Sequence, residues 1–121
     1  MTIRGRVIKG EQKAGRYYGV PTANLDYEMA PDIEPGVYTG QAILTESKIF
    51  PCVICYGALV LSGKMKCEVH LIGCDEDLYD REIALTILDR VNDLVPFVSH
   101  EQMRQKIHAD LLKAKQMLGI N

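Results

Sequence analysis

The chain has 121 residues, of which 47% are hydrophobic and 25% charged, and its net charge is −2. This length fits one domain with a buried core, and the charge balance gives no electrostatic reason to expect nucleic acid or an anionic membrane as partner. No apolar run approaches the roughly 20 residues that span a bilayer. Because Met1-Thr2-Ile3-Arg4 leads into a strand-like pattern without a signal-peptide core, we expect the protein in the cytoplasm. We expect residues 1–121 to form one domain and the chain to be a monomer.

Short segments of alternating polarity, separated by turn residues, fill the first three quarters of the chain. In the first of them, Ile3, Gly5 and Val7 share one face of a predicted strand. Gly10, Gly15 and Gly19 mark a loop in the segment that follows. Extended segments are predicted at residues 2–9, 21–25, 37–45, 49–56, 65–72 and 82–90, with loops at 10–19 and 26–36, a hairpin link at 57–64 and an acidic turn at 75–77.

The end of the chain has the pattern of a helix. Ser99 is a good N-cap, Gln102 stands three residues later as in a capping box, and Gly119 is a natural stop. The apolar residues between them recur at helical spacing and should pack on the core: Met103, Ile107, Leu111, Ala114 and Leu118. Many short strands followed by one helix predict a mainly β fold, a small closed antiparallel barrel with a C-terminal amphipathic helix.

Four cysteines raise the question of a disulfide or metal site. Cys52 and Cys55 form a C-x-x-C, but they fall in a predicted strand, where residues three apart point to opposite faces. Cys67 and Cys74 are single. We therefore expect reduced, at least half-buried thiols, with a metal site as the weaker alternative.

Residues 15–25, which contain Gly15, Gly19 and Pro21-Thr22-Ala23-Asn24, resemble the signature of the riboflavin kinase family. Other segments resemble that family in the same order, over about residues 4–118: Gly5-Arg6-Val7, Gly36-Val37-Tyr38, Glu68-Val69-His70-Leu71, Asp77-Leu78-Tyr79, and Phe97 with Ser99 before the helix. The resemblance implies a stand-alone kinase barrel that transfers the γ-phosphate of a nucleoside triphosphate, expected to be ATP, to the ribityl 5′-hydroxyl of riboflavin. Its partners would be riboflavin and FMN, ATP and ADP.

The Pro-Thr-Ala-Asn segment is the candidate metal and nucleotide site. An extended backbone puts Thr22 and Asn24 on one face, and their side-chain oxygens are hard ligands that suit Mg²⁺. From the residues alone, the favoured interpretation is that both cap a turn. The resemblance implies that Thr22 and Asn24 bind Mg²⁺. It also implies that the nucleotide contacts Gly15, Arg16, Gly19, Pro21 and Thr22, with glycine backbone N–H groups approaching the phosphates; the spacing of a Walker loop is absent.

Glu68 is the candidate general base. Strand alternation puts Lys66, Glu68 and His70 on one face and the apolar residues between them on the other. The resemblance implies that Glu68 takes the proton of the ribityl hydroxyl; on residue type alone it could be a solvated carboxylate. His70 is expected to be structural.

Three segments depart from the family pattern. Residues 57–60 lack the usual Pro-Thr or Asn-Pro, Asp80 replaces a glycine, and residues 92–97 lack the arginine and glutamate of an R-x-E-x-x-F stretch. They leave room for a non-catalytic flavin or nucleotide sensor, or for an interaction module without a ligand. The adenylyltransferase domain of many bacterial members is missing from this sequence, so we expect no FAD synthesis by this chain alone.

Overall fold

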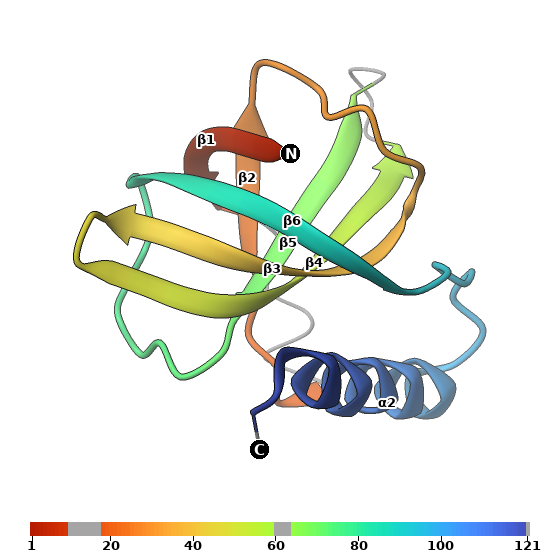
Figure 1. The fold of residues 1–121 in the computed structure, drawn as a ribbon. Coiled ribbons are helices and arrows are strands. Elements are labelled where there is room, and N and C mark those ends of the chain that lie inside the picture. The colour runs from red at the N-terminus through yellow and green to blue at the C-terminus, as the bar shows by residue number, and fades with distance from the viewer. Residues whose placement is uncertain (10–17, 60–63, 121) are drawn as a thin grey trace.

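The computed structural model describes residues 1–9, 18–59 and 64–120. In these residues, antiparallel strands close into a barrel in the order β1-β2-β5-β4-β3-β6, and helix α2 (His100–Leu118) lies against one side of it (Figure 1). The strands are β1 (Thr2–Ile8), β2 (Ala23–Tyr27), β3 (Gly36–Thr45), β4 (Lys48–Leu59), β5 (Met65–Leu71) and β6 (Glu82–Asn92). The closed barrel with its C-terminal helix confirms the predicted fold class.

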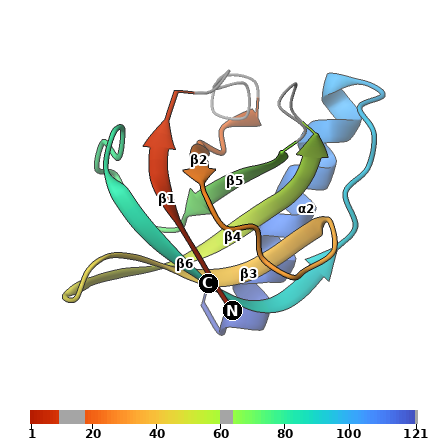
Figure 2. The same ribbon diagram turned by 90° about the horizontal axis from the view of Figure 1, so that it is seen from above.

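Alternation along each strand fills the barrel interior. On β5, Cys67, Val69 and Leu71 are buried while the residues between them are partly exposed, as predicted. Ile3 and Val7 of β1 point into the same core. Figure 2 shows the strands arranged around this interior, with α2 on the outside of the barrel.

The second strand differs from its prediction. It runs from Ala23 to Tyr27 instead of over residues 21–25. The reason is its antiparallel pairing with β1, which extends from Ile8 opposite Asn24 to Gly5 opposite Tyr27, and the burial of Tyr27 in the core. The loop predicted for residues 10–19 lies outside the described residues except for its last two. Strands β4 and β5 pair as a hairpin, but residues 60–63 of the predicted link also lie outside the described part.

Helix α2 begins and ends as predicted. The Ser99 hydroxyl accepts a hydrogen bond from the Gln102 backbone N–H at 3.2 Å, and Gly119 adopts a left-handed φ of 73° at the C-cap. Ala114 is fully buried against Val37, Val53 and Val91 of the barrel. The remaining members of the predicted stripe are half-buried, and the second buried residue of the helix is the polar Asp110.

No helix in the described part of the chain is both long enough and apolar enough to cross a membrane.

The cysteines are all free thiols, as predicted. Cys52 and Cys67 are buried in the barrel interior, while Cys55 lies on the outer face beneath α2. The two cysteines of the C-x-x-C therefore point to opposite sides of β4, and their geometry does not suit a shared metal ion or a disulfide.

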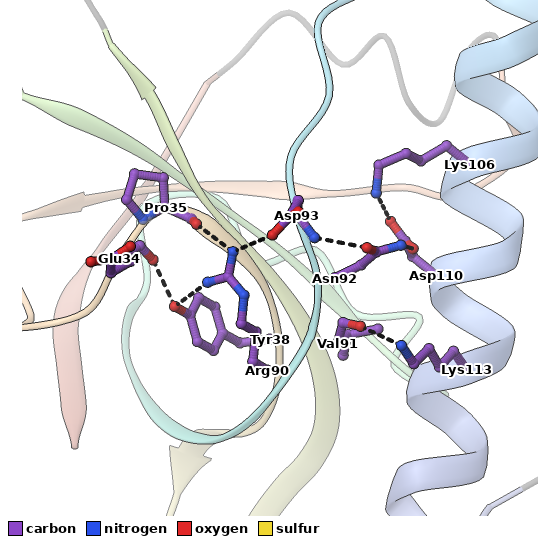
Figure 3. A network of polar contacts seen from close by, with 10 residues as sticks. All are labelled: Glu34, Pro35, Tyr38, Arg90, Val91, Asn92, Asp93, Lys106, Asp110 and Lys113. Atoms are coloured by element: carbon purple, nitrogen blue, oxygen red, sulfur yellow. Dashed lines mark hydrogen bonds and ion pairs between the residues drawn. The ribbon is translucent and has the colours of Figure 1, made fainter.

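A guanidinium holds the end of β6 to the start of β3 (Figure 3). Arg90 donates to the Tyr38 hydroxyl at 2.9 Å, to the Pro35 carbonyl at 3.0 Å and to the Asp93 carboxylate at 2.8 Å. Gly36 makes this packing possible, because a Cβ there would lie 2.5 Å from Nη1 of Arg90. These bonds fix the end of β6 to the start of β3 and to the segment that leads from β6 to α2.

A second network joins the end of β6 to α2 (Figure 3). Asn92 donates through Nδ2 to the Asp110 carboxylate at 3.0 Å, and Lys106 pairs with the other oxygen of that carboxylate. Lys113 donates to the Val91 carbonyl at 2.7 Å. These contacts and the apolar cluster under Ala114 together fix the helix on the barrel.

Candidate functional site

Strands β2 and β5 bring together the residues predicted to act on phosphate and hydroxyl groups. Asn24 lies directly opposite Glu68 in the antiparallel pairing of these strands. The Thr22 hydroxyl, just before β2, donates to Oε2 of Glu68 at 3.2 Å. Residues 46 positions apart in the sequence thus form one cluster of a hydroxyl, an amide and a carboxylate on the outer face of the barrel.

The Glu68 carboxylate also has a cationic partner. Lys66, two residues earlier on β5, places Nζ 2.8 Å from Oε1, and both side chains are about two-thirds covered. One carboxylate oxygen therefore faces Thr22 and the other faces Lys66. The predicted alternation put Lys66 on this face, but its pairing with Glu68 was not anticipated.

Cys55 lies beside Glu68 on the neighbouring strand β4. Burial raises the pKa of the Cys55 thiol to about 12, and the nearby Glu68 and Asp110 charges add to this effect. Cys55 is therefore a neutral thiol at physiological pH and offers neither a thiolate nucleophile nor a soft metal ligand to the site.

A cavity of about 470 Å³ opens next to this cluster. It is bordered by the end of β1, by Pro21 to Asn24, by the end of β5 and by the turn from Cys74 to Tyr79. A volume of this size suits a ligand such as a nucleotide. Among the described residues that line it, Thr22 and Asn24 are present and Glu68 is not, so the candidate base adjoins the cavity through Thr22.

The acidic turn that borders the cavity is ordered by ion pairs. Glu76 accepts from Lys48 at 3.1 Å and from Arg81 at 3.2 Å. The hydrogen bond from Lys48 and then the other charge interactions hold the pKa of Glu76 below its ordinary value. Lys9, at the end of β1, lies 5.4 Å over the ring of Tyr79. The cavity rim thus combines an aromatic ring, a lysine and a carboxylate-rich turn.

The predicted nucleotide contacts are only partly described. Gly15 and Arg16 lie outside the described residues. Gly19 is exposed and left-handed, with a φ of 72°, and Pro21 lines the cavity. The Pro21 carbonyl is 2.7 Å from Nδ1 of His70, and burial lowers the pKa of this histidine.

The structure describes at least one residue in each of the three segments that depart from the family pattern. Asp80 occupies a left-handed backbone position with a φ of 66°, where glycine would be unstrained. Asn92, at the position of the missing arginine, instead binds Asp110 of the helix. Gly57 is close-packed, since a Cβ there would lie 2.6 Å from both Leu94 and Pro35.

The donor set favours a hard cation. Among the described residues, no group of three or more His, Cys, Asp or Glu side chains is arranged to hold a metal ion. The Thr22 hydroxyl, the Asn24 amide and the Glu68 carboxylate are oxygen donors grouped on one face. Such donors fit Mg²⁺, which takes few protein ligands and completes its shell with phosphate and water.

Comparison with known proteins points to one family. A sequence model described as riboflavin kinase matches residues 1–118. The chain is 30% identical to a bifunctional riboflavin kinase/FMN adenylyltransferase of Escherichia coli over 120 residues, which cover 98% of this chain and 38% of the relative. It is 26% identical to a mouse riboflavin kinase, covering 97% of this chain and 80% of the relative.

The fold is also similar to a solved structure. A crystal structure of riboflavin kinase from Trypanosoma brucei matches with a TM-score of 0.67 at 18% identity, covering 98% of this chain and 76% of that one. At this identity the match supports the fold. The chain spans less than two fifths of the length of the bifunctional bacterial relative.

Proposed function

Since the chain belongs to the riboflavin kinase family, we propose that it transfers the γ-phosphate of ATP to the ribityl 5′-hydroxyl of riboflavin and forms FMN. The observation that carries this proposal is the grouping of Thr22, Asn24 and Glu68 on β2 and β5 beside a cavity of about 470 Å³. Phosphoryl transfer depends chiefly on positioning and charge stabilisation, and a rigid pair of strands supplies the positioning.

Glu68 acts as the general base in this proposal. Its carboxylate is oriented from two sides, by the Thr22 hydroxyl and by the Lys66 ammonium group. As the ribityl oxygen attacks the γ-phosphate, its proton passes to a Glu68 oxygen. A base in hydrogen-bond reach contributes about 10²–10⁴-fold to such a reaction.

Thr22 and Asn24 would hold Mg²⁺ together with the phosphates. When bound, the cation neutralises the charge that accumulates on the transferring phosphoryl group. Asn24 is almost fully buried and directly opposite Glu68, so its amide is held in place by the strand pairing. The end of β1 and the turn 74–79 would enclose the nucleotide in the cavity.

The flavin ring needs an apolar surface. The segment between β6 and α2 exposes Leu94, Val95, Phe97 and Val98, with Val98 at 70% and Phe97 at 58%. Leu94 packs close to Gly57, which follows Cys55 and Tyr56 on the strand beside Glu68. We place the isoalloxazine ring on this apolar segment, with the ribityl chain directed toward Glu68.

The test is formation of FMN by the purified chain from riboflavin and Mg²⁺, with ATP, CTP and GTP supplied in parallel and the product separated by chromatography. We expect FMN with ATP. If no donor yields FMN but flavin binds tightly, the sensor alternative replaces the kinase. If neither product nor flavin binding is found, the interaction-module alternative replaces it.

Replacement of the base gives the first specific prediction. Glu68→Gln keeps the hydrogen bond from Thr22 but removes the proton acceptor, so turnover should fall at least ~10²-fold while nucleotide binding is retained. Steady-state kinetics and titration calorimetry measure the two effects. Glu82→Gln, at an exposed strand position of β6, is the matched control and should retain turnover. Unchanged turnover in the Glu68 variant would remove it from the base role.

Replacement of the amide gives the second prediction. Asn24→Ala should weaken ATP binding in Mg²⁺ by about tenfold, because a positioned oxygen ligand is lost. The same titration in EDTA should show little difference between this variant and the unmodified chain. An equal affinity in Mg²⁺ would contradict the assignment of Asn24 as a ligand. Circular dichroism establishes that the barrel is intact.

A further inference from the structure

All three histidines of the chain contact one short segment, Tyr18 to Pro21. His70 on β5 has Nδ1 2.7 Å from the Pro21 carbonyl oxygen. On helix α2, His108 has Nε2 2.7 Å from the Tyr18 carbonyl oxygen, and His100 has Nδ1 2.9 Å from the Tyr18 hydroxyl. The contacts thus come from two elements, from β5 at the Pro21 end of the segment and from α2 at the Tyr18 end.

Two of these contacts define which ring nitrogen carries the proton. A carbonyl oxygen can only accept a hydrogen bond, so Nδ1 of His70 and Nε2 of His108 must be donors. Burial lowers the pKa of His70, which favours a neutral ring with its proton on Nδ1. The hydroxyl of Tyr18 can donate or accept, so the tautomer of His100 stays open.

The segment leads directly into the candidate nucleotide site. The β2–β5 pairing includes Asn24 opposite Glu68 and Ala23 opposite Val69. His70 is the next residue of β5, and its side chain reaches the backbone at Pro21, beyond the first residue of β2. The segment is therefore attached to β5 beyond the start of β2 at Ala23. The hydrogen bond at Pro21 and the strand pairing at Ala23 hold the backbone on both sides of Thr22.

The other end of the segment is anchored by burial. Tyr18 and Val20 are 8% and 5% exposed, and Gly19 between them makes the left-handed turn. The Tyr18 ring lies 5.9 Å from the His100 ring. Residues 18–21 are consequently fixed between α2 and β5, immediately before Thr22.

We propose that His70 and His108 are positioning residues of the nucleotide site, which hold Tyr18 to Pro21 so that Thr22 and Asn24 face the cavity. His100 supports them through the Tyr18 side chain. The histidine clamp, as we name these three residues, makes the C-terminal helix a part of the site although none of the described cavity-lining residues belongs to α2. Its effect on the nucleotide rests on the proposed function; the clamp on the backbone does not.

Paired substitutions test the clamp, because asparagine and glutamine place an amide N–H at different depths. The Asn amide nitrogen can occupy the position of Nδ1, and the Gln amide nitrogen that of Nε2. At position 70, His70→Asn should preserve the bond to Pro21 and His70→Gln should lose it. At position 108 the order should reverse, with His108→Gln preserving the bond to Tyr18 and His108→Asn losing it.

The first readout is independent of catalysis. Amide hydrogen exchange of residues 20–24, measured by mass spectrometry, should be about five- to tenfold faster in His70→Gln and His108→Asn than in their matched partners, as expected for loss of one hydrogen bond. A general loss of packing would affect both members of a pair alike. The same order at both positions, or no difference within the pairs, would overturn the clamp.

The second readout is kinetic. The KM for ATP in Mg²⁺ should be about five- to tenfold higher in the two mismatched variants than in the matched ones, with a smaller change in kcat. If the unmodified chain makes no FMN, the proposed function fails and the exchange data still decide on the clamp. If FMN is made and exchange differs as expected but KM does not, the clamp has no positioning role and this inference is overturned.

Discussion

Asp80 shows what a single residue contributes directly after the turn that borders the cavity. Its backbone is left-handed, with a φ of 66°, and Arg6 donates to its carbonyl oxygen at 2.6 Å. A Cβ in this conformation is strained, although aspartate tolerates it better than most residues. The Asp80 carboxylate lies 3.6 Å from Arg6, and this exposed pair contributes little.

We therefore expect Asp80→Gly to stabilise the chain by about 0.5–1 kcal/mol, since the strain disappears and the Arg6 bond to the backbone remains. Urea denaturation followed by circular dichroism measures the change. Asp80→Ala is the control, because it removes the carboxylate but retains the Cβ, and it should be less stable than the unmodified chain. If the order of stability differs from Gly above Asp above Ala, the left-handed φ does not determine how residue 80 affects the free energy of unfolding.

The attachment of helix α2 to the barrel depends on a small group of polar side chains. Asp110 is buried and binds the largely covered Lys106 and the exposed Asn92, and these side chains form the polar contact between the helix and β6. Asp110→Asn leaves the ammonium group of Lys106 without its carboxylate in a largely covered position. We expect a loss of about 2–3 kcal/mol in the free energy of unfolding, measured by urea denaturation.

Two further variants separate charge from packing at this position. Removal of both charges in Lys106→Met with Asp110→Asn should recover more than half of the loss, because the amide oxygen introduced at position 110 can still accept from Asn92. Glu101→Gln breaks the exposed pair with Arg104 on the same helix and should cost less than about 0.5 kcal/mol. Equal losses for the buried and the exposed pair would contradict the role given to Asp110.

Local sequence patterns predicted the helix and the strands well. They predicted poorly which residues far apart in the sequence contact one another. The caps of α2 at Ser99 and Gly119 depend on neighbouring residues, so the sequence was enough to place them. The bounds of β2 depend on pairing with β1, and the burial of Asp110 depends on Asn92 from a different element. No periodicity within one segment contains that information.

The same distinction applies to the candidate site. Alternation placed Lys66, Glu68 and His70 on one face of β5, which the structure confirms. That His70, His100 and His108 all contact residues 18–21 follows only from the closure of the barrel and the docking of α2. As residue types, the histidines gave no signal of this shared target.

Across the whole molecule, a row of directly paired residues on neighbouring strands runs around the barrel. This row connects the side of the barrel that α2 covers to the candidate site. Directly paired residues follow each other across five strands: Asn92 on β6, Val37 on β3, Cys55 on β4, Glu68 on β5 and Asn24 on β2. Helix α2 covers the first part of this row, through the cluster that includes Val37 and Ala114. The row ends at Asn24, which lines the cavity, with Glu68 directly beside it on β5. The proposed substrate site would therefore lie next to the helix on the same face of the barrel.

Thiol chemistry tests the integrity of this arrangement as a whole. Burial raises the pKa of Cys52, Cys55 and Cys67 to about 12, whereas Cys74 is half-buried and lines the cavity. With a disulfide reagent at about pH 8, we expect one fast thiol, which is absent in Cys74→Ser. Cys52 and Cys67 should react only as the barrel unfolds, and Cys55 only once α2 leaves the barrel. ATP with Mg²⁺ should slow the fast reaction, because the nucleotide would cover Cys74. A fast reaction of Cys52 or Cys67 in the native chain would contradict the closed barrel, and a fast reaction of Cys55 would contradict the docking of α2. A fast phase insensitive to ATP would contradict the nucleotide's place in the cavity.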